Sequence, residues 1–197
     1  ELIQAVLKAP VDLLWNGGIG TYIKGAGETH AEVGDRANMA VRIDGGQLRC
    51  KIVGEGGNLG MTQRGRIEAA RVAGVQINTD FIDNSAGVDT SDHEVNIKVL
   101  LAPMVAAGQL GPDARRELLA SMTDEVAQLV LAHNADQSLA LSTEQAQPSL
   151  AGAHEAWMRS LEKVGVLDRA LEGLPSREEM EARLAEGGAL SRPELAM

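Results

Sequence analysis

Two stretches rich in glycine and asparagine hold the side chains best suited to binding a small ligand. Residues 54–60 read GEGGNLG and follow an apolar run that ends at Val53. Residues 84–91 read NSAGVDTS and follow a second, shorter apolar run at 75–77. Asparagine carries a hydrogen-bond donor and an acceptor on one side chain, and glycine lets a ligand approach the backbone closely. Such loops at the ends of strands are where an open α/β sheet binds its ligands.

The glycine spacing of the first loop departs from the dinucleotide-binding fingerprint. It is G-x-G-x-x-x-G instead of G-x-G-x-x-G, and no acidic residue stands where one would bind the ribose. The motif alone therefore favours a glycine-rich turn over a cofactor site. Asn58 favours a cofactor site, because its amide can pair with a carboxamide or with a ribose hydroxyl. Both interpretations stay open at this point.

Two interpretations also fit the second loop. Ser91 and Glu94 have the spacing of a capping box, so the loop is expected to lead into a helix capped by Ser91. The free N–H groups of a helix N-terminus and a serine hydroxyl together form a carboxylate site. Gly87 would let an anion reach the backbone, and Asn84 would add a donor. Ser91 is thus expected to cap a helix, to bind a carboxylate, or to do both.

Acidic residues and one histidine gather around the second loop: Asp80, Asp83, Asp89, Asp92, His93 and Glu94. They lack the spacing of an EF-hand and the paired histidines of zinc enzymes, so we expect a solvated acidic loop and no metal site. The other histidines show no partner pattern and are expected to be ordinary surface or hydrogen-bonded residues. They are His30, His133 and His154. No G-x-S-x-G motif or cysteine–histidine pairing indicates a covalent nucleophile.

The first half of the chain is predicted to form a sheet with short helices. Residues 11–15 are apolar and predict a buried strand, which leads into a loop at 16–21. Asp44 and Gly45 lie between two alternating stretches and predict a β-hairpin over 41–53, whose second strand would lead into the first loop. Residues 63–73 have helical spacing, and Gly74 is expected to end that helix.

Helical periodicity dominates from Asp92 to the end of the chain. One long amphipathic helix is expected over 115–133, and capping-box sequences predict helix starts at Ser142 and Ser176. We therefore predict an α/β fold, with a partial Rossmann-type nucleotide-binding sheet in residues 1–105 and a helical domain in residues 106–197. The chain starts without methionine and ends on a helix start at 191–197, so we interpret it as a segment of a longer protein.

Composition excludes several classes of function. The net charge of −10 and the pI near 4.9 argue against nucleic-acid binding, which needs a basic surface. Aromatic residues make up 2% of the chain, too few for a surface that stacks on bases. No apolar run reaches the roughly 20 residues that span a membrane, and no partner membrane is expected. Cys50 is the single cysteine, which excludes a disulfide within the chain and favours a cytoplasmic protein.

The two loops and their flanks resemble the signature loops of glutamate dehydrogenases. In that family one strand leads into Glu-Gly-Ala-Asn, and a later strand leads into Asn-Ala-Gly-Gly-Val followed by a serine. The matching stretches here read IVGEGGN at 52–58 and NSAGVDTS at 84–91. The likeness is closest to the large NAD-specific glutamate dehydrogenases of bacteria, through DLLWNGGIGTYIK at 12–24 and NTDFIDNSAGVD at 78–89. The helical half is similar to their C-terminal region, so the resemblance covers essentially the whole chain.

The resemblance implies an oxidoreductase that converts L-glutamate to 2-oxoglutarate and ammonia, with NAD as the hydride acceptor. Cofactor contacts would come from Asn16, Gly17, Gly18, Gly56, Gly57, Asn58 and Asn84. Substrate contacts would come from Asn84, Gly87 and Ser91, with the Ser91 hydroxyl on the side-chain carboxylate of glutamate. Upstream domains of the same chain and a homo-oligomer are implied as partners.

The sequence departs from the family pattern in three ways. Ser85-Ala86-Gly87 stands where the family has Ala-Gly-Gly, so one glycine is unmatched. The glycine-rich turn that binds pyrophosphate is absent from this segment, and so are the lysine and the aspartate that move protons. We therefore expect no catalytic residue here, and no activity from the segment alone. The alternative from another class is a non-catalytic interaction or regulatory module that carries a vestigial nucleotide-binding fold.

Overall fold

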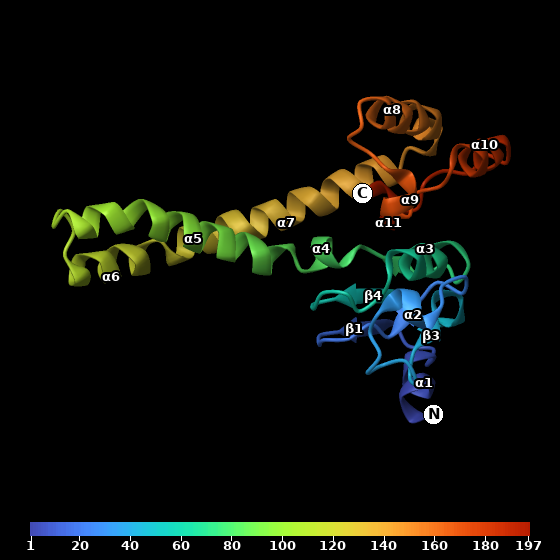
Figure 1. The fold of residues 1–197 in the computed structure, drawn as a ribbon, viewed down its shortest axis with the longest axis horizontal. Coiled ribbons are helices and arrows are strands. Elements are labelled where there is room, and N and C mark those ends of the chain that lie inside the picture. The colour runs from blue at the N-terminus through green and yellow to red at the C-terminus, as the bar shows by residue number, and fades with distance from the viewer.

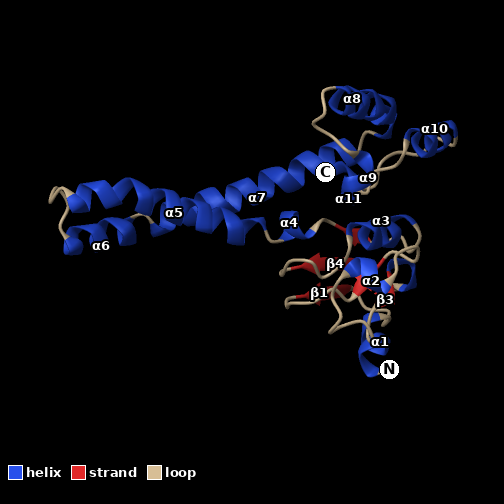
Figure 2. Cartoon of the chain, in the orientation of Figure 1, coloured by secondary structure: helices blue, strands red, loops and turns tan.

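The computed structural model describes residues 1–197 and is mostly helical, with its strands gathered at one end of the molecule (Figures 1 and 2). The strands are short and parallel. β1 (Leu13–Asn16), β4 (Ile52–Glu55) and β5 (Gln76–Ile77) form one sheet in the order β1-β4-β5, with Leu13 opposite Ile52 and Ile52 opposite Gln76. β2 (Ile23–Lys24) and β3 (Ile43–Asp44) form a second pair. The α/β class predicted for the first half is confirmed at this level.

Short helices surround these strands. They are α1 (Leu2–Leu7), α2 (His30–Val33), the 3-10 turn η1 (Gly45–Gln47), α3 (Gln63–Arg71) and α4 (Asp80–Asp83). The predicted helix at 63–73 is confirmed as α3, and Gly74 follows it in the left-handed conformation. An aliphatic core fills the space around α3 and includes Val53, Met61, Ala69 and Ile77. Burial of this apolar surface positions the strand ends that carry the two loops.

The hairpin predicted over 41–53 is wrong. Ile43 pairs in parallel with Ile23, whereas Ile52 lies between β1 and β5 in the other sheet. Asp44 starts η1 instead of a two-residue turn, and its backbone N–H donates to the Gln47 side chain over 3.2 Å. Gly45 then packs so closely on α3 that an added Cβ would lie 2.3 Å from the Gly65 carbonyl oxygen. Packing on α3 thus overrides the local turn preference of Asp-Gly.

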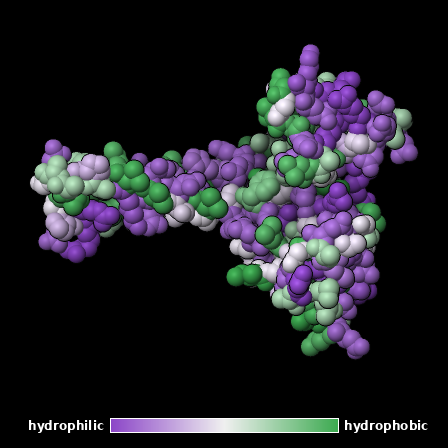
Figure 3. All heavy atoms as spheres, in the orientation of Figure 1, coloured by the Kyte–Doolittle hydropathy of each residue, from purple (hydrophilic) through white to green (hydrophobic).

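The strand predicted at 11–15 is present as β1, but it is not buried. Leu13 and Trp15 expose 54% and 59% of their surface, and Ile52 of β4 beside them exposes 44%. These three side chains belong to one face of the sheet, since β1 and β4 are paired in register. Figure 3 shows further apolar residues on the surface of the molecule, along the helical arm as well as on the body.

The arm consists of α5 (Ser85–Ala106), α6 (Pro112–Ser121) and α7 (Thr123–Gln145), and projects from the body (Figure 1). The prediction of one helix over 115–133 is wrong, because the helix is interrupted at Met122 between α6 and α7. The Ser121 hydroxyl donates to the Leu118 carbonyl over 2.8 Å, a side-chain bond that competes with continued helix. The three helices pack on one another, and α7 also packs against α4 and α11.

The chain returns from the arm to the body through η2 (Pro148–Leu150), α8 (Ala151–Lys163), α9 (Arg169–Glu172), α10 (Arg177–Ala185) and α11 (Arg192–Leu195). The capping box predicted at Ser176 is confirmed and starts α10, and the helix start expected at 191–197 is α11. The start predicted at Ser142 is wrong: this residue lies in the last turn of α7, and its hydroxyl donates backward to the Ser138 carbonyl. α11 packs against α3 and α7, so residues far apart in the sequence meet at one place.

Candidate functional site

The carboxyl ends of β1, β4 and β5 lie at one edge of the sheet, because the three strands are parallel. β1 ends at Asn16, and the loop after β4 starts at Gly56. The N–H groups of Gly56 and Gly57 donate to the Asn16 carbonyl over 2.9 and 3.2 Å. The structure therefore places the glycine-rich loop at 54–60 against the end of β1, from which the loop predicted at 16–21 continues.

Most glycines of the first loop make room for neighbouring parts of the chain. A Cβ on Gly57 would lie 2.8 Å from the Gly18 carbonyl oxygen, and one on Gly60 would lie 1.7 Å from Nδ2 of Asn16. Gly54 and Gly56 lie under the indole of Trp15, where a Cβ would come within 2.6 and 2.4 Å of ring atoms. Close packing against β1 and the loop that follows it thus accounts for these glycines, in agreement with the glycine-rich turn that the motif favoured.

Asn58 and Asn84 lie side by side at the sheet edge. The Asn84 side-chain amide donates to Oδ1 of Asn58 over 2.8 Å, on the surface of the molecule. One amide N–H of Asn84 and the N–H groups of Asn58 remain available at this position. A planar ligand group with one donor and one acceptor, such as a carboxamide, matches this pair of amides.

Leu59 holds the Asn58 loop in an unusual backbone conformation. Its φ is +60°, the only positive φ of a non-glycine residue in the structure. Two hydrogen bonds fix it: its N–H donates to Oδ2 of Asp80 over 2.7 Å, and its carbonyl accepts from the Thr21 hydroxyl over 2.7 Å. A left-handed leucine costs about 1–3 kcal/mol and persists only where surrounding contacts determine it, which is typical of binding loops.

A buried ion-pair network lies next to the Asn58 loop on the interior side and holds it in place. Glu55, at the end of β4, is fully buried and accepts from Nε and Nη2 of Arg66 over 2.6 and 3.0 Å. The Arg66 guanidinium also lies 3.1 Å from Asp80. Burial raises the pKa of the Glu55 carboxyl, while the hydrogen bonds from Arg66 act in the opposite direction. Sequence reasoning missed this network, because Glu55 and Arg66 come from different elements and carry no shared motif.

Two of the acidic residues expected in a solvated loop are structural instead. Asp80 is buried and, besides its contact with Arg66, accepts from the Leu59 N–H. Asp83 accepts from the Glu55 N–H over 2.9 Å and from the Asn78 side chain over 2.6 Å. Both belong to α4, so this part of the expected acidic loop is a short helix that fastens β4 to the start of α5.

The second loop is also helical, and Ser91 does not cap it. α5 begins at Ser85 with Asn84 as its N-cap, so Gly87 lies in the first turn and Ser91 in the second. The helix start is fixed by packing on α7, where Asn134 donates to the Ile82 carbonyl and to the Ser85 hydroxyl over 3.0 and 2.7 Å. The free N–H groups are consequently those nearest Ser85, and Ser91 offers only its exposed hydroxyl.

The remaining members of the cluster lie along α5, and the three histidines outside the cluster each have a hydrogen-bond partner. Asp89, His93 and His133 form one group, with His133 contributed by α7. His154 binds the Glu144 carboxylate over 3.0 Å, and Nδ1 of His30 lies 3.1 Å from the Arg42 guanidinium. The hydrogen-bonded state expected for these histidines is confirmed, although the group around Asp89 was not foreseen.

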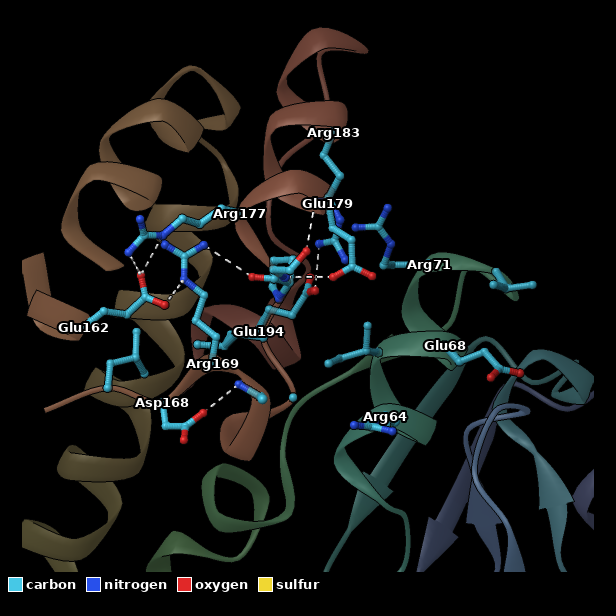
Figure 4. A pocket seen from close by; sticks show the side chains of 18 residues that line it. Arg64, Glu68, Arg71, Glu162, Asp168, Arg169, Arg177, Glu179, Arg183 and Glu194 are labelled. Carbon is cyan, nitrogen blue, oxygen red and sulfur yellow. Dashed lines mark hydrogen bonds and ion pairs between the residues drawn. The ribbon is translucent and has the colours of Figure 1, made fainter. Parts of the chain in front are cut away.

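A hollow of about 930 Å³ lies between α3 and the C-terminal helices, away from the strand-end loops (Figure 4). Five of its ten charged side chains form ion pairs with one another. Glu162 binds both Arg169 and Arg177, and Arg183 binds Glu194 over 2.7 Å. The side chains of Glu155 and Glu162 raise the pKa of Arg169. None of the strand-end residues lines this hollow. Its ion pairs join α8 to α9 and α10, and α10 to α11.

Comparison with known proteins agrees with the resemblance seen in the loops. The family model described as bacterial NAD-glutamate dehydrogenase, catalytic domain, matches residues 1–144. The chain belongs to this family. It is 56% identical over 199 residues to the NAD-specific glutamate dehydrogenase of Pseudomonas aeruginosa. It is 54% identical to the proteins of the same name from Halomonas elongata, over 198 residues, and from Mycobacterium tuberculosis, over 197 residues.

Each of these matches covers the whole of this chain and 12% of the relative. The family resemblance inferred from the two loops is therefore confirmed, and the match spans a small part of each glutamate dehydrogenase. No helix in the structure is long and apolar enough to cross a membrane.

Proposed function

We propose that this chain is a segment of an enzyme that oxidatively deaminates L-glutamate to 2-oxoglutarate and ammonia, with NAD as the hydride acceptor. The observation that carries the proposal is the pair Asn58–Asn84, joined over 2.8 Å at the carboxyl edge of a parallel sheet in a chain of this family. Ligands of open α/β sheets bind at that edge. In the reaction, glutamate, NAD and water yield 2-oxoglutarate, ammonium, NADH and a proton.

The segment would comprise two parts. Residues 1–105 would be the distal part of a Rossmann-type dinucleotide-binding domain, supported by the parallel order β1-β4-β5 and by the loops at its carboxyl edge. Residues 106–197 would be a helical C-terminal domain. The boundary falls at the end of α5, which starts at the sheet edge and runs into the arm. α5 would thus connect the ligand-binding edge with the helical part.

The residues of this chain would bind and orient the reactants. The amides of Asn58 and Asn84 fit a nicotinamide carboxamide or a ribose hydroxyl, because they present donors and an acceptor to solvent at one point. The cofactor-binding set would be Asn16, Gly17, Gly18, Gly56, Gly57, Asn58 and Asn84. NAD, when bound, accepts the hydride from the α-carbon of the substrate. Holding both partners in contact is the contribution that this segment would make to the rate.

Substrate would lie toward the first turns of α5. Asn84, Gly87 and Ser91 would contact glutamate, with the exposed Ser91 hydroxyl donating to its side-chain carboxylate. The N–H groups at the start of α5 add favourable electrostatics for that carboxylate. Ser91 lies in the second turn of α5 and does not cap the helix. Removal of its hydroxyl should therefore weaken glutamate binding without destabilising the start of the helix.

The groups that move protons would lie outside these residues. The family uses a lysine and an aspartate for that purpose, and the segment matches 12% of its relatives. We therefore propose that upstream domains of the same chain complete the active site, that the segment alone is inactive, and that the enzyme works as a homo-oligomer. We also propose a cytoplasmic location for the enzyme.

The test is NADH formation by the full-length protein with glutamate and either NAD or NADP, followed by absorbance. Ser91→Ala is compared with Ser121→Ala, which removes a hydroxyl from the arm that bonds only the Leu118 carbonyl. We expect activity with NAD and a rise of tenfold or more in KM for glutamate in Ser91→Ala alone. An active parent that is indifferent to Ser91→Ala would remove Ser91 from the substrate site. No turnover of any amino acid would favour the non-catalytic regulatory module instead.

A further inference from the structure

We propose that Asp89, His93 and His133 form a binding site for a divalent transition-metal ion of the zinc class. Asp89 and His93 are four residues apart on α5, a spacing that puts both side chains on one face of a helix. His133 comes from α7, which packs against that face. Two imidazoles and one carboxylate on two rigid elements are a ligand set that zinc accepts.

The three side chains already converge. Nδ1 of His133 lies 2.7 Å from Oδ2 of Asp89, and Nε2 of His93 lies 3.5 Å from Oδ1 of the same carboxylate. One ligand atom from each residue lies within 4.8 Å of the other two. The two imidazole rings are stacked, with their centroids 6.1 Å apart and an angle of 16° between their planes. A ring nitrogen of each histidine thus lies near the carboxylate of Asp89.

His93 provides an independent observation that points to a ligand. Its Nε2 is buried and makes no hydrogen bond, although the rest of the side chain is partly exposed. A buried polar atom without a partner is uncommon and costs about 1–3 kcal/mol. The atom lies on the side of the ring that faces Asp89. A metal ion bound between Asp89 and His133 would give this nitrogen its missing partner.

The chemistry of the set favours zinc over calcium or magnesium. Calcium and magnesium take oxygen ligands, whereas two of the three ligands here are imidazole nitrogens. Zinc bonds of about 2.0–2.2 Å would draw the three ligand atoms closer together than in the present structure. His133 exposes 49% of its side chain and can rotate to close that gap. The same exposure leaves one coordination position open to water and gives the ion a path of entry.

Binding would fasten α5 to α7 close to the start of α5. Asp89 is five residues from Asn84, so the ion would fix the segment of helix that leaves the sheet edge. A ligand that binds only the folded state stabilises that state in proportion to its concentration. The site is separate from the proposed glutamate and NAD contacts, because none of its three residues belongs to them. The inference can therefore be tested without measuring turnover.

The experiment uses the untagged full-length protein, stripped with a chelator and equilibrated by dialysis with zinc and, separately, with cobalt. Metal content per chain and the visible absorption of cobalt are compared among the wild type, His93→Ala, His133→Ala and Asp89→Asn. His154→Ala is the matched control, because His154 pairs with a single carboxylate and has no second imidazole. We expect the three site variants to lose one equivalent of metal, or to bind it at least tenfold more weakly, while the control retains it.

Folding is checked by the thermal midpoint of each metal-free variant. His133→Ala is the decisive change, because its half-exposed side chain can be removed with little effect on the core. Zinc should raise the midpoint of the wild type and of His154→Ala, and should leave that of His133→Ala unchanged. Equal metal content in the wild type and in folded His133→Ala would overturn the proposal. The three side chains would then be a hydrogen-bonded contact between two helices.

Discussion

Nδ2 of Asn84 donates to Oδ1 of Asn58 over 2.8 Å and so joins two loops that are 26 residues apart in the sequence. Each asparagine stands where a strand or a short helix ends, and each keeps polar atoms exposed. The loop of Asn58 is fixed below by Leu59 and Asp80, and Asn84 is fixed by the start of α5. Two amides held this firmly form a prepared surface, which lowers the entropy cost of binding a ligand.

Changing either asparagine should lower the proposed glutamate-oxidising activity of the full-length protein. We expect Asn58→Ala and Asn84→Ala each to reduce kcat/KM about tenfold or more, which is about 1.4 kcal/mol of transition-state stabilisation. The double variant should lose less than the sum of the two, because the residues contact each other. Asn96→Ala is the control, since its side chain bonds only the Asp92 carbonyl within α5. If the loss in the double variant equalled the sum of the two single losses, the contact between the two amides would not contribute to activity.

Removal of the Glu55 side chain should lower the free energy of unfolding, because it supports the loop at the end of β4. Glu55→Ala leaves the buried Arg66 guanidinium without its closest partner, and breaking a buried pair in this way costs about 3–5 kcal/mol. Asp12→Ala breaks the exposed pair with Lys51 and should cost about 0–1 kcal/mol. Denaturant unfolding of both variants in the same parent measures the difference. Similar losses for the two would show that Glu55 and Arg66 do not support the loop.

A methyl group at position 60 should push the loop after β4 away from Asn16 at the end of β1. The Cβ of Gly60→Ala would lie 1.7 Å from Nδ2 of Asn16 and 3.0 Å from Oε1 of Glu55, so the side chain of Asn16 must move. We expect a loss of about 1–3 kcal/mol in stability together with weaker binding of NAD. Gly27→Ala adds the same methyl group where no atom lies within 4 Å, and should leave both quantities unchanged. A stable Gly60→Ala variant with normal NAD affinity would contradict this packing.

The contribution of Asp35 to stability should depend on pH. Hydrogen bonds from the Asn38 side chain and the Thr21 N–H lower the pKa of the Asp35 carboxyl. The folded state then binds this proton less readily than the unfolded state, so the stabilisation is complete above the ordinary pKa of aspartate. It is lost as the pH falls through the lowered value. The difference in thermal midpoint between the wild type and Asp35→Asn should therefore be largest near neutral pH and shrink in acid.

Local features of the sequence were sufficient for several parts of this structure. The helical spacing of residues 63–73 with Gly74 after them predicted α3, and the capping box at Ser176 predicted α10. The glycine and asparagine of the two loops indicated the family. These features depend on hydrogen bonds and turns between neighbours in the chain, so they can be recognised from short stretches.

Tertiary structure decided the features that join distant residues. The packing of Gly45 on α3 turned a predicted hairpin into strands of two parallel sheets, and contacts with Asn134 set the start of α5 at Ser85 instead of Ser91. The pairing of Glu55 with Arg66 and of Asp89 with His133 likewise carries no local signal. Such contacts form only when particular apolar surfaces are buried together, and which surfaces are buried depends on the packing of the whole chain. Short stretches of sequence were thus sufficient for α3, α10 and the family, while tertiary packing decided which charged and polar side chains meet.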